Sequence, residues 1–317
     1  MKQEPLHLRY SSKKISSFAK PVVYFLCLLL AYLLGYLSSS THNNNKPPDH
    51  INTMVDHVNA VNVINHATEL GDHSDFGAVC CEAVPPQDIR HKILERVFKG
   101  TSPWENFPPS HVDNLLRKKW IKGWGSKGAV FENLIRRVRP KTIIEVGTFL
   151  GASALHMVEL TRRLGLDGTQ IICIDDFRGW PGFSDHLRMK GMKMVNGDVL
   201  LMYQFMQNVM EANATEAVVY MPFSSGSALE KLCEWGVFGE LIEVDAGHDF
   251  HSAWSDINRA FKLLKPGSNG GVIFGHDYFT AADNRGVRRA VKLFARVHNL
   301  TVQVDGQHWF FHITNRL

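Results

Sequence analysis

Two acidic residues stand just after apolar segments that have the length and composition of buried strands. Asp245 follows residues 241–244, and Asp277 comes shortly after residues 272–274. In a parallel sheet, the carboxyl ends of neighbouring strands lie along one edge, so both carboxylates would face the same cleft. Two hard oxygen ligands suit Mg²⁺ or Mn²⁺, with water and substrate oxygens completing the coordination.

His248 lies three residues beyond Asp245 and would reach the same cleft. An imidazole titrates near neutral pH, so it can take a proton from a substrate as a general base. The alternative is an ordinary surface residue, because the chain has 16 histidines. The flanking aspartates favour the catalytic role.

A second candidate motif, EVGTFLGAS, runs from Glu145 to Ser153 between a strand-like segment and a helical one. Gly147 permits a sharp turn, and Gly151 lets the backbone approach a ligand where a helix begins. The GxxxG spacing differs from the dinucleotide fingerprint GxGxxG. A carboxylate two residues before the first glycine suits a cationic ligand rather than a pyrophosphate. The alternative is a plain turn, since glycines are common in such turns.

The next strand-like segment, residues 171–174, is followed by Asp175. An acidic residue at this place can accept hydrogen bonds from a ribose diol. A cap is the alternative, and that role also suits Asp176. The loop that follows carries Trp180, whose indole could stack on adenine or on a sugar ring. The alternative for Trp180 is simple packing inside the protein.

Strand-like and helix-like segments alternate through most of the chain. The apolar strand-like runs lie at 142–146, 171–174, 217–220, 241–244 and 272–274. Helical patterns lie near 152–164, 198–211, 227–235, 250–264 and 284–297, after two earlier helices that begin near Asp88 and Ser126. This alternation predicts an α/β fold with a Rossmann-like, doubly wound parallel sheet. The end of the chain instead predicts an antiparallel hairpin of residues 300–304 and 308–313, turned by Asp305-Gly306.

Four motifs together resemble the class I S-adenosylmethionine-dependent methyltransferases. They are EVGTFLGAS, the IDD after the second strand, DAGHDFHSAWSD and LLKPGSNGGVIFGHDY. The nearest subgroup is the metal-dependent O-methyltransferases that act on sugars in antibiotic biosynthesis, similar to methyltransferase family 24. The resemblance covers roughly residues 125–317, and it implies the class I methyltransferase fold, whose parallel sheet is closed by an antiparallel seventh strand.

The resemblance also implies roles for individual residues. The cofactor S-adenosylmethionine would be bound by Glu145, Gly147, Gly151 and Ser153 through its amino acid part, by Asp175 through its ribose, and by the segment containing Ser225 through its adenine. A divalent metal would be bound by Asp245, His276 and Asp277, with His248 as the catalytic base. The chain departs from the family pattern at His276, where the family has an acidic residue, and at Ser224–Ser227, where it often has Gly-Asp-Ser. Ala246 stands where the family usually has glycine.

The charge of the chain is concentrated at its start. The net charge is +4, and residues 1–20 hold five cations and one anion, which leaves 30 charges of each sign in residues 21–317. A domain without a broad basic surface is a poor partner for the phosphate backbone, so we exclude nucleic acid.

Residues 21–38 form an apolar segment with no charged residue. As a helix they would span about 27 Å, which is enough for a thin bilayer. The cations on the N-terminal side predict a cytosolic tail at 1–20 and a lumenal bulk. We therefore expect a type II membrane protein of the Golgi, with the endoplasmic reticulum as the alternative compartment. A cleaved signal peptide is the alternative interpretation of the segment.

The remaining features agree with a lumenal position. Residues 39–78 are polar and rich in His and Asn and predict a stem, whose spaced valines leave a homodimer open. Asn213 and Asn299 begin N-glycosylation sequons. Four cysteines follow the apolar segment: Cys80, Cys81, Cys173 and Cys233. Their pairing is open, although Cys173 lies in an apolar run that predicts a buried thiol.

We therefore predict a lumenal methyltransferase domain at 79–317, with its core at 125–317. It would transfer a methyl group from S-adenosylmethionine to an oxygen of a glycan or of a small-molecule acceptor. One alternative is a degenerate, non-catalytic scaffold with the same fold. Another is a glycosyltransferase, which the lack of an Asp-x-Asp sequence disfavours.

Overall fold

The structure is a computed structural model that describes residues 79–180, 185–186, 189–265 and 267–314, together with Leu30. The predicted tail at 1–20, membrane span at 21–38 and stem at 39–78 lie outside the described residues, Leu30 excepted. Among the residues that are described, none belongs to a helix with the length and apolar character that a bilayer crossing requires.

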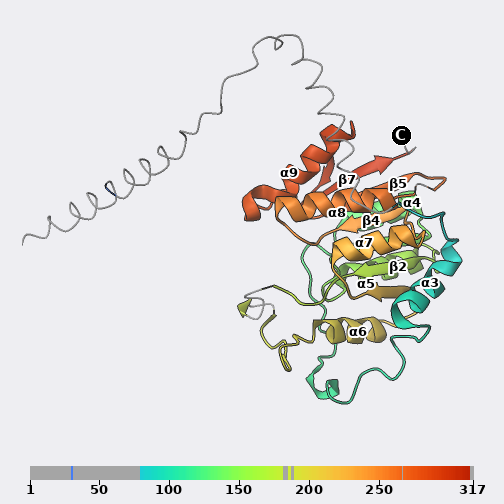
Figure 1. Cartoon of the computed structure of the whole chain (residues 1–317), viewed down its shortest axis with the longest axis vertical. Coiled ribbons are helices and arrows are strands. Elements are labelled where there is room, and N and C mark those ends of the chain that lie inside the picture. The colour runs from blue at the N-terminus through green and yellow to red at the C-terminus, as the bar shows by residue number, and fades with distance from the viewer. Residues whose placement is uncertain (1–29, 31–78, 181–184, 187–188, 266, 315–317) are drawn as a thin grey trace, which may run out of the picture. The chain divides into compact units, whose positions relative to one another are not determined.

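A seven-stranded sheet forms the centre of the described domain (Figure 1). Its spatial order is β3-β2-β1-β4-β5-β7-β6. The strands are β1 (Thr142–Val146), β2 (Gln170–Ile174), β3 (Val218–Met221), β4 (Leu241–Val244), β5 (Gly271–Gly275), β6 (Gln303–Asp305) and β7 (His308–Ile313). The first five are parallel, and β7 pairs antiparallel with β5 and β6. The predicted doubly wound sheet with a terminal antiparallel hairpin is thus confirmed, and the strand order reverses between β1 and β4, where such folds bind ligands.

Helices cover both faces of this sheet. They are α3 (Pro86–Phe98), α4 (Ala129–Val138), α5 (Ala152–Arg163), α6 (Leu201–Glu211), α7 (Ser225–Glu234), α8 (Phe250–Leu263) and α9 (Ala282–Val297), with a short 3₁₀ helix, η1, at Asp113–Leu115. Buried side chains of α3, α7, α8 and α9 pack in one apolar core, and those of α4, α5 and α6 in a second. The strands supply both cores by alternation: Ile144 and Val146 of β1 join the first core, and Ile143 joins the second.

Several predicted boundaries move in the structure. Helix α6 begins at Leu201 rather than near 198, because Leu200 has a left-handed φ of 55°. Strand β6 begins at Gln303 rather than at 300. Its last residue, Asp305, pairs with His308, so the turn residues are Gly306 and Gln307 rather than Asp305 and Gly306.

The start of α9 also differs from the expected helix near 284–297. Three successive residues, Asp283, Asn284 and Arg285, have left-handed φ values of 51°, 53° and 56°. Regular helical geometry therefore begins at Gly286, and the segment before it forms a separate left-handed turn.

A disulfide links Cys80 to Cys233, which lies in α7. The same contact is extended by backbone hydrogen bonds from Cys81 N to Cys233 O and from Val84 N to Gly236 O. Cys81 is free and exposed, and Cys173 is free and buried, as the apolar run around it predicted. The first residues of the described domain are thus joined to the end of α7 and to the turn that follows it.

Candidate functional site

Three neighbouring parallel strands end level with one another at the carboxyl edge of the sheet. The paired ends of β1, β4 and β5 are Val146, Val244 and Gly275. The residues that follow on β4 and β5, Asp245 and His276, therefore leave the sheet side by side. The predicted convergence of these two strands on one cleft is confirmed by this register.

Asp277 lies at the centre of a polar cluster at this edge. Its Oδ2 atom lies 3.1 Å from Nε2 of His248 and 3.3 Å from Nδ1 of His276, and its Oδ1 accepts a hydrogen bond of 2.5 Å from Thr280 Oγ1. Burial alone would raise the pKa of Asp277, but the two imidazoles and the Thr280 hydroxyl hold this pKa well below its usual range. Asp277 is therefore a carboxylate at neutral pH. Its φ of 62° places it in the left-handed region, which is uncommon for a residue other than glycine.

The charges of the neighbouring groups follow from this carboxylate. The hydrogen bond to Asp277 raises the pKa of His248 and outweighs its partial burial. Asp245 is buried, which raises its pKa to about 6, while the charge of His276 acts in the opposite direction. The cluster thus combines one firmly ionised carboxylate with a second carboxyl group and two imidazoles.

The donor set of this cluster fits a divalent metal. Ligand atoms of Asp245, His248 and Asp277 lie within 4.8 Å of one another. The Nδ1 atom of His276 is buried and has no well-oriented hydrogen-bond partner among the described residues, so it is a further available donor. The predicted ligands Asp245, His276 and Asp277 are therefore brought together, and His248, predicted as a base, lies within the same set. Two imidazoles make the set softer than an all-oxygen site.

The loop that carries His248 is held from two sides. The Asp249 carboxylate caps α8 by accepting hydrogen bonds of 3.0 Å from the backbone N–H groups of His251 and Ser252. On the other side lies Gly286 of α9, where a Cβ atom would fall 2.4 Å from the carbonyl oxygen of His248. The close packing of α9 against this loop fixes the backbone that positions His248.

Gly147 is required where the first strand meets its loop. Its φ is +93°, and a Cβ atom there would lie 2.0 Å from the carbonyl oxygen of Asp245. Gly151 precedes α5 with a φ of +79°, and a Cβ atom would lie 3.0 Å from the ring of Phe205. Both glycines therefore serve the turn itself.

Glu145 is fully buried beneath this turn. Its carboxyl oxygens accept hydrogen bonds of 2.5 Å from Thr148 Oγ1 and from Ser153 Oγ. Burial raises the pKa of Glu145 to about 7, although these two hydroxyls lower it. Ser153, predicted to contact the cofactor, thus directs its hydroxyl at Glu145, and Thr148 is a partner that the sequence motif did not single out.

Asp175 ties the ends of the first two strands together. Its carboxylate accepts hydrogen bonds from the backbone N–H of Phe149, at 2.8 Å, and of Phe177, at 2.7 Å. Burial raises its pKa, and these hydrogen bonds oppose the shift. Asp176, by contrast, accepts from the backbone of Arg178 and caps the turn, in line with the capping role considered for it.

Ser225 begins α7 beyond the third strand. Its hydroxyl donates a 2.6 Å hydrogen bond to Asp256 of α8. Burial raises the pKa of Asp256 to about 6. The predicted adenine-side residue therefore has its hydroxyl committed to a buried carboxyl group, and its backbone remains at the start of a helix.

An aromatic cluster lies above the loop of Gly147 and Gly151. The ring centroid of Trp124 is 5.6 Å from that of Phe149, 6.4 Å from that of Trp180 and 5.5 Å from that of His186. Trp180 is 46% exposed, so it is no interior plug. Trp124 had no motif around it, and only the fold brings it to the site.

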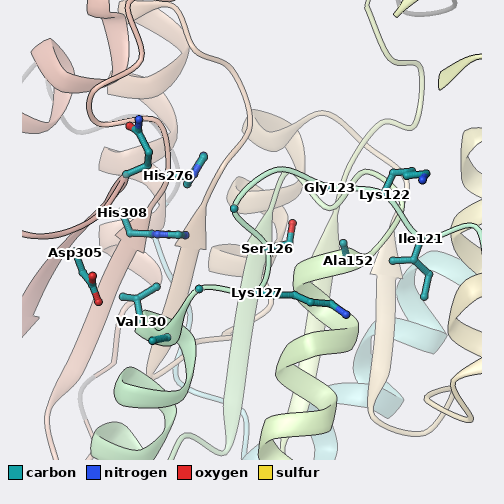
Figure 2. Close-up of a pocket in the computed structure, with 15 residues that line it drawn as sticks. Ile121, Lys122, Gly123, Ser126, Lys127, Val130, Ala152, His276, Asp305 and His308 are labelled. Carbon is teal, nitrogen blue, oxygen red and sulfur yellow. The ribbon is translucent and has the colours of Figure 1, made fainter. Parts of the chain in front are cut away.

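A hollow of about 760 Å³ opens beside the polar cluster around Asp277, between the starts of α4 and α5 (Figure 2). His276 and His308 lie at one side of it, and Ile121 and Lys122 lie at the other. Lys127 extends across the space between the two helices. Gly125 lies in its wall, where a Cβ atom would fall 2.3 Å from Nε2 of His276. The hollow therefore reaches the polar cluster through His276.

Comparison with protein families gives one match. A model described as a methyltransferase domain matches residues 144–278. The match spans less than half of the 317 residues, yet it contains every candidate site residue that we inferred from the sequence. A search of curated proteins found no match to this chain.

Several solved O-methyltransferases share similarity with the chain at low identity. A putative O-methyltransferase from Klebsiella pneumoniae is 19% identical, with a TM-score of 0.44, over 66% of this chain and 91% of its own. TomG from Streptomyces achromogenes, solved with SAM, is 14% identical, with a TM-score of 0.43, over 62% and 82%. The O-methyltransferase from Bacillus cereus, solved with SAH, is 17% identical, with a TM-score of 0.43, over 72% and 97%. By sequence, the segment that holds the whole candidate site is similar to a methyltransferase domain.

Proposed function

We propose that this chain is an S-adenosylmethionine-dependent methyltransferase that acts on an oxygen of a glycan or of a small-molecule acceptor. The observation that carries the proposal is the methyltransferase-domain match over residues 144–278. That segment contains both the loop after β1 and the polar cluster around Asp277, which lie at the same edge of the sheet where ligands bind in doubly wound folds.

The loop after β1 and the residues around it have the groups that the cofactor requires. Glu145 lies buried beneath the loop after β1, and a cationic ligand bound at that loop would favour its ionised form. Asp175 retains lone pairs for the ribose hydroxyls beyond its two backbone hydrogen bonds. The faces of Trp124 and Phe149 offer a cation–π contact to a sulfonium. Ser225 would offer its backbone rather than its hydroxyl to the adenine.

The polar cluster around Asp277 has the groups for the methyl transfer. When bound, S-adenosylmethionine would supply the methyl group, with a new C–O bond to the acceptor replacing the C–S bond, whose electron pair stays on sulfur. His248 would take the acceptor proton. With its Nε2–H directed at Asp277, its Nδ1 is left to accept that proton, and its 43% exposed side chain is open to an entering acceptor.

A divalent ion, if bound, would lower the pKa of the acceptor hydroxyl. We assign its binding to Asp245, Asp277 and His276. His276 is preferred over His248 as the nitrogen ligand because its side chain is only 10% exposed and its buried Nδ1, which lies 3.3 Å from Asp277 Oδ2, makes no well-oriented hydrogen bond within the described residues. A histidine cannot use one lone pair both as a metal ligand and as a base, so this assignment keeps the two roles apart.

We also propose that the domain faces the lumen of the Golgi, or else of the endoplasmic reticulum, on a type II anchor at residues 21–38. The disulfide between Cys80 and Cys233 supports an oxidising compartment. Asn213 and Asn299 are exposed and follow α6 and α9. These helices end at the edge of the sheet opposite the polar cluster around Asp277, so glycans there would leave that cluster open.

Two measurements test these proposals. Calorimetry of the full chain with S-adenosylmethionine and with its demethylated product should give a binding signal in both cases, and labelled methyl should appear in a fraction of a microsomal extract. Binding of nucleotide sugars instead would favour a glycosyltransferase, and cofactor binding without transfer to any fraction would favour a scaffold. For the topology, expression in secretory cells should give glycans that Asn213→Gln and Asn299→Gln remove. A chain without glycans at either site would contradict the lumenal assignment.

A further inference from the structure

The hollow beside His276 continues along α5. A second hollow of about 350 Å³ shares Ile121, Lys127 and Ala152 with the first and extends past His156 to Arg162. Ala152 and Arg162 are ten residues apart on one helix, which corresponds to about 15 Å. We call the two hollows together the α5 groove. It is longer than one sugar ring, and it ends at the polar cluster.

The lining of the α5 groove combines apolar side chains, among them Ile121, Val130 and Leu155, with polar groups. Where it approaches His276 the wall includes four glycines, at positions 123, 125, 128 and 306, together with the side chains of Ser126 and Gln307. The space that a Cβ atom would take is open at Gly306, so a sugar ring can approach the backbone N–H and C=O groups there, whereas protein side chains take that space at positions 123, 125 and 128. A carbohydrate chain matches this lining and the open shape of the groove.

The charge at the middle of the groove is positive. Lys122 and Lys127 both line it, and neither forms a hydrogen bond or an ion pair with any residue in the described part of the chain. Lys127 is close enough to His156 that its charge helps burial to lower the pKa of that imidazole. Two carboxylates, Asp305 and Glu159, also line the groove, one in each hollow, and within the described residues no ion pair joins either of them to Lys122 or Lys127.

We propose that the α5 groove binds the acceptor as an acidic oligosaccharide. Carboxylate or sulfate groups of the sugar chain pair with Lys122 and Lys127, and the sugar to be methylated lies at the His276 end. This inference rests on the proposed methyltransferase function and narrows it, because it names the acceptor class and the residues that select it. Unpaired lysines at the centre of a binding groove favour an anionic ligand over a neutral one.

The test measures binding rather than turnover. The full chain is titrated with three oligosaccharides of equal length: a uronate chain, a sulfated chain and a neutral chain. The double variant Lys122→Glu/Lys127→Glu is compared with Lys141→Glu, whose lysine immediately precedes β1 and therefore lies at the opposite edge of the sheet. Thermal melting checks that each variant folds, and a separate titration follows S-adenosylmethionine.

We expect the wild-type chain to bind at least one acidic chain and the neutral chain about tenfold more weakly or worse. The double reversal should weaken acidic binding by about tenfold or more, added salt should weaken it as well, and Lys141→Glu should change it by less than about twofold. Cofactor affinity should stay unchanged in all variants. The uronate and sulfated arms identify which anionic group is selected.

Two outcomes would overturn the inference: equal binding of the neutral chain, or an equal loss in Lys141→Glu. A chain that binds the cofactor but no oligosaccharide would also overturn it, and would leave the proposed methyltransferase function standing. A chain that binds acidic oligosaccharides through the two lysines but no cofactor would support the groove and contradict the proposed function.

Discussion

The Nε2 atom of His248 lies 3.1 Å from Oδ2 of Asp277, across the ends of two parallel strands. His276 Nδ1 approaches the same oxygen at 3.3 Å, so one carboxylate organises both imidazoles. The Asp277 carboxylate therefore couples the proposed base to the proposed metal ligands.

Replacing Asp277 by Asn should abolish methyl transfer while the cofactor still binds. The amide keeps the shape but loses the charge that orients His248 and contributes to the metal site, so we expect transfer to fall by about 100-fold or more. Cofactor affinity, measured by calorimetry, should change by less than about threefold. Asp283→Asn is the control, because Asp283 acts on His248 only through its charge at a distance. Transfer at the wild-type rate in Asp277→Asn would exclude a catalytic role for the pairing of His248 with Asp277.

Gly147→Ala should remove cofactor binding. The added Cβ would fall 2.0 Å from the carbonyl oxygen of Asp245, and the φ of +93° disfavours any side chain. The loop after β1 must therefore move. Gly165→Ala is a matched control, since Gly165 also has a positive φ, of +65°, but has open space around it. That variant should lose only about 1 kcal/mol of stability and keep its cofactor affinity. Similar affinities in the two variants would contradict the role of this turn.

His276→Asp should shift the metal preference toward Mg²⁺. The proposed metal ligands include one imidazole, His276, which favours Zn²⁺ over the harder ions Mg²⁺ and Mn²⁺, and the variant replaces it with a hard oxygen donor. Calorimetric titration with the three chlorides, without cofactor, should show the ratio of Mg²⁺ to Zn²⁺ affinity rising by about tenfold or more. His91→Asp changes an exposed histidine of α3 and should leave the ratio unchanged. A constant ratio in His276→Asp would exclude His276 from the coordination.

Asp256→Asn should alter the pH dependence of stability. Burial raises the folded-state pKa of Asp256 to about 6, above the unfolded value of about 3.9. The folded state therefore binds the proton more tightly. This stabilisation is fully present below about pH 4 and is lost as the pH rises through 6. Relative to Asp256→Asn, the wild-type chain should lose about 2 kcal/mol of unfolding free energy over this window, measured by urea denaturation. Asp167→Asn, in an exposed turn, should show no such difference.

Removing the disulfide should destabilise the domain. Cys80 and Cys233 are 153 residues apart, so the bond constrains a long loop of the unfolded chain. Cys80→Ser should lower the unfolding free energy by about 2–5 kcal/mol. Cys81→Ser, at the adjacent free and exposed cysteine, should cost less than about 0.5 kcal/mol. If reducing agent left the melting temperature of the wild-type domain unchanged, the bond would contribute nothing to stability.

The strands were predictable because their signal is local. A short, mostly apolar run marks a strand that is buried on both faces, and residues 142–146 and 241–244, each interrupted by one glutamate, coincide with β1 and β4. The carboxyl-edge position of Asp245 and Asp277 then follows from the parallel topology alone. The exact ends of the strands, such as the start of β6, could not be predicted from the sequence, because strand pairing and turn geometry determine them.

Side-chain partners were not predictable in the same way. Ser153 and Ser225 carry hydroxyls whose direction depends on rotamer and neighbours, and the structure directs them to Glu145 and Asp256. Trp124 comes from a segment without any motif, and its neighbours at the site are close to it only in the folded chain. A sequence pattern identifies which residues reach an edge, but not which of them contact one another there.

The packing of Gly286 against the backbone of His248 has a consequence for what the domain is as a unit. The region similar to methyltransferase domains ends at Tyr278 and contains the proposed base and the proposed metal ligands. The glycine that packs against the backbone of the proposed base, Gly286, nevertheless lies in α9. In addition, Gln307, in the turn between β6 and β7, accepts hydrogen bonds from the backbone of Tyr278 and Phe279. An excised 144–278 fragment would carry the reactive groups without the scaffold that aligns them. A fragment that is designed to carry this site must therefore extend through β7.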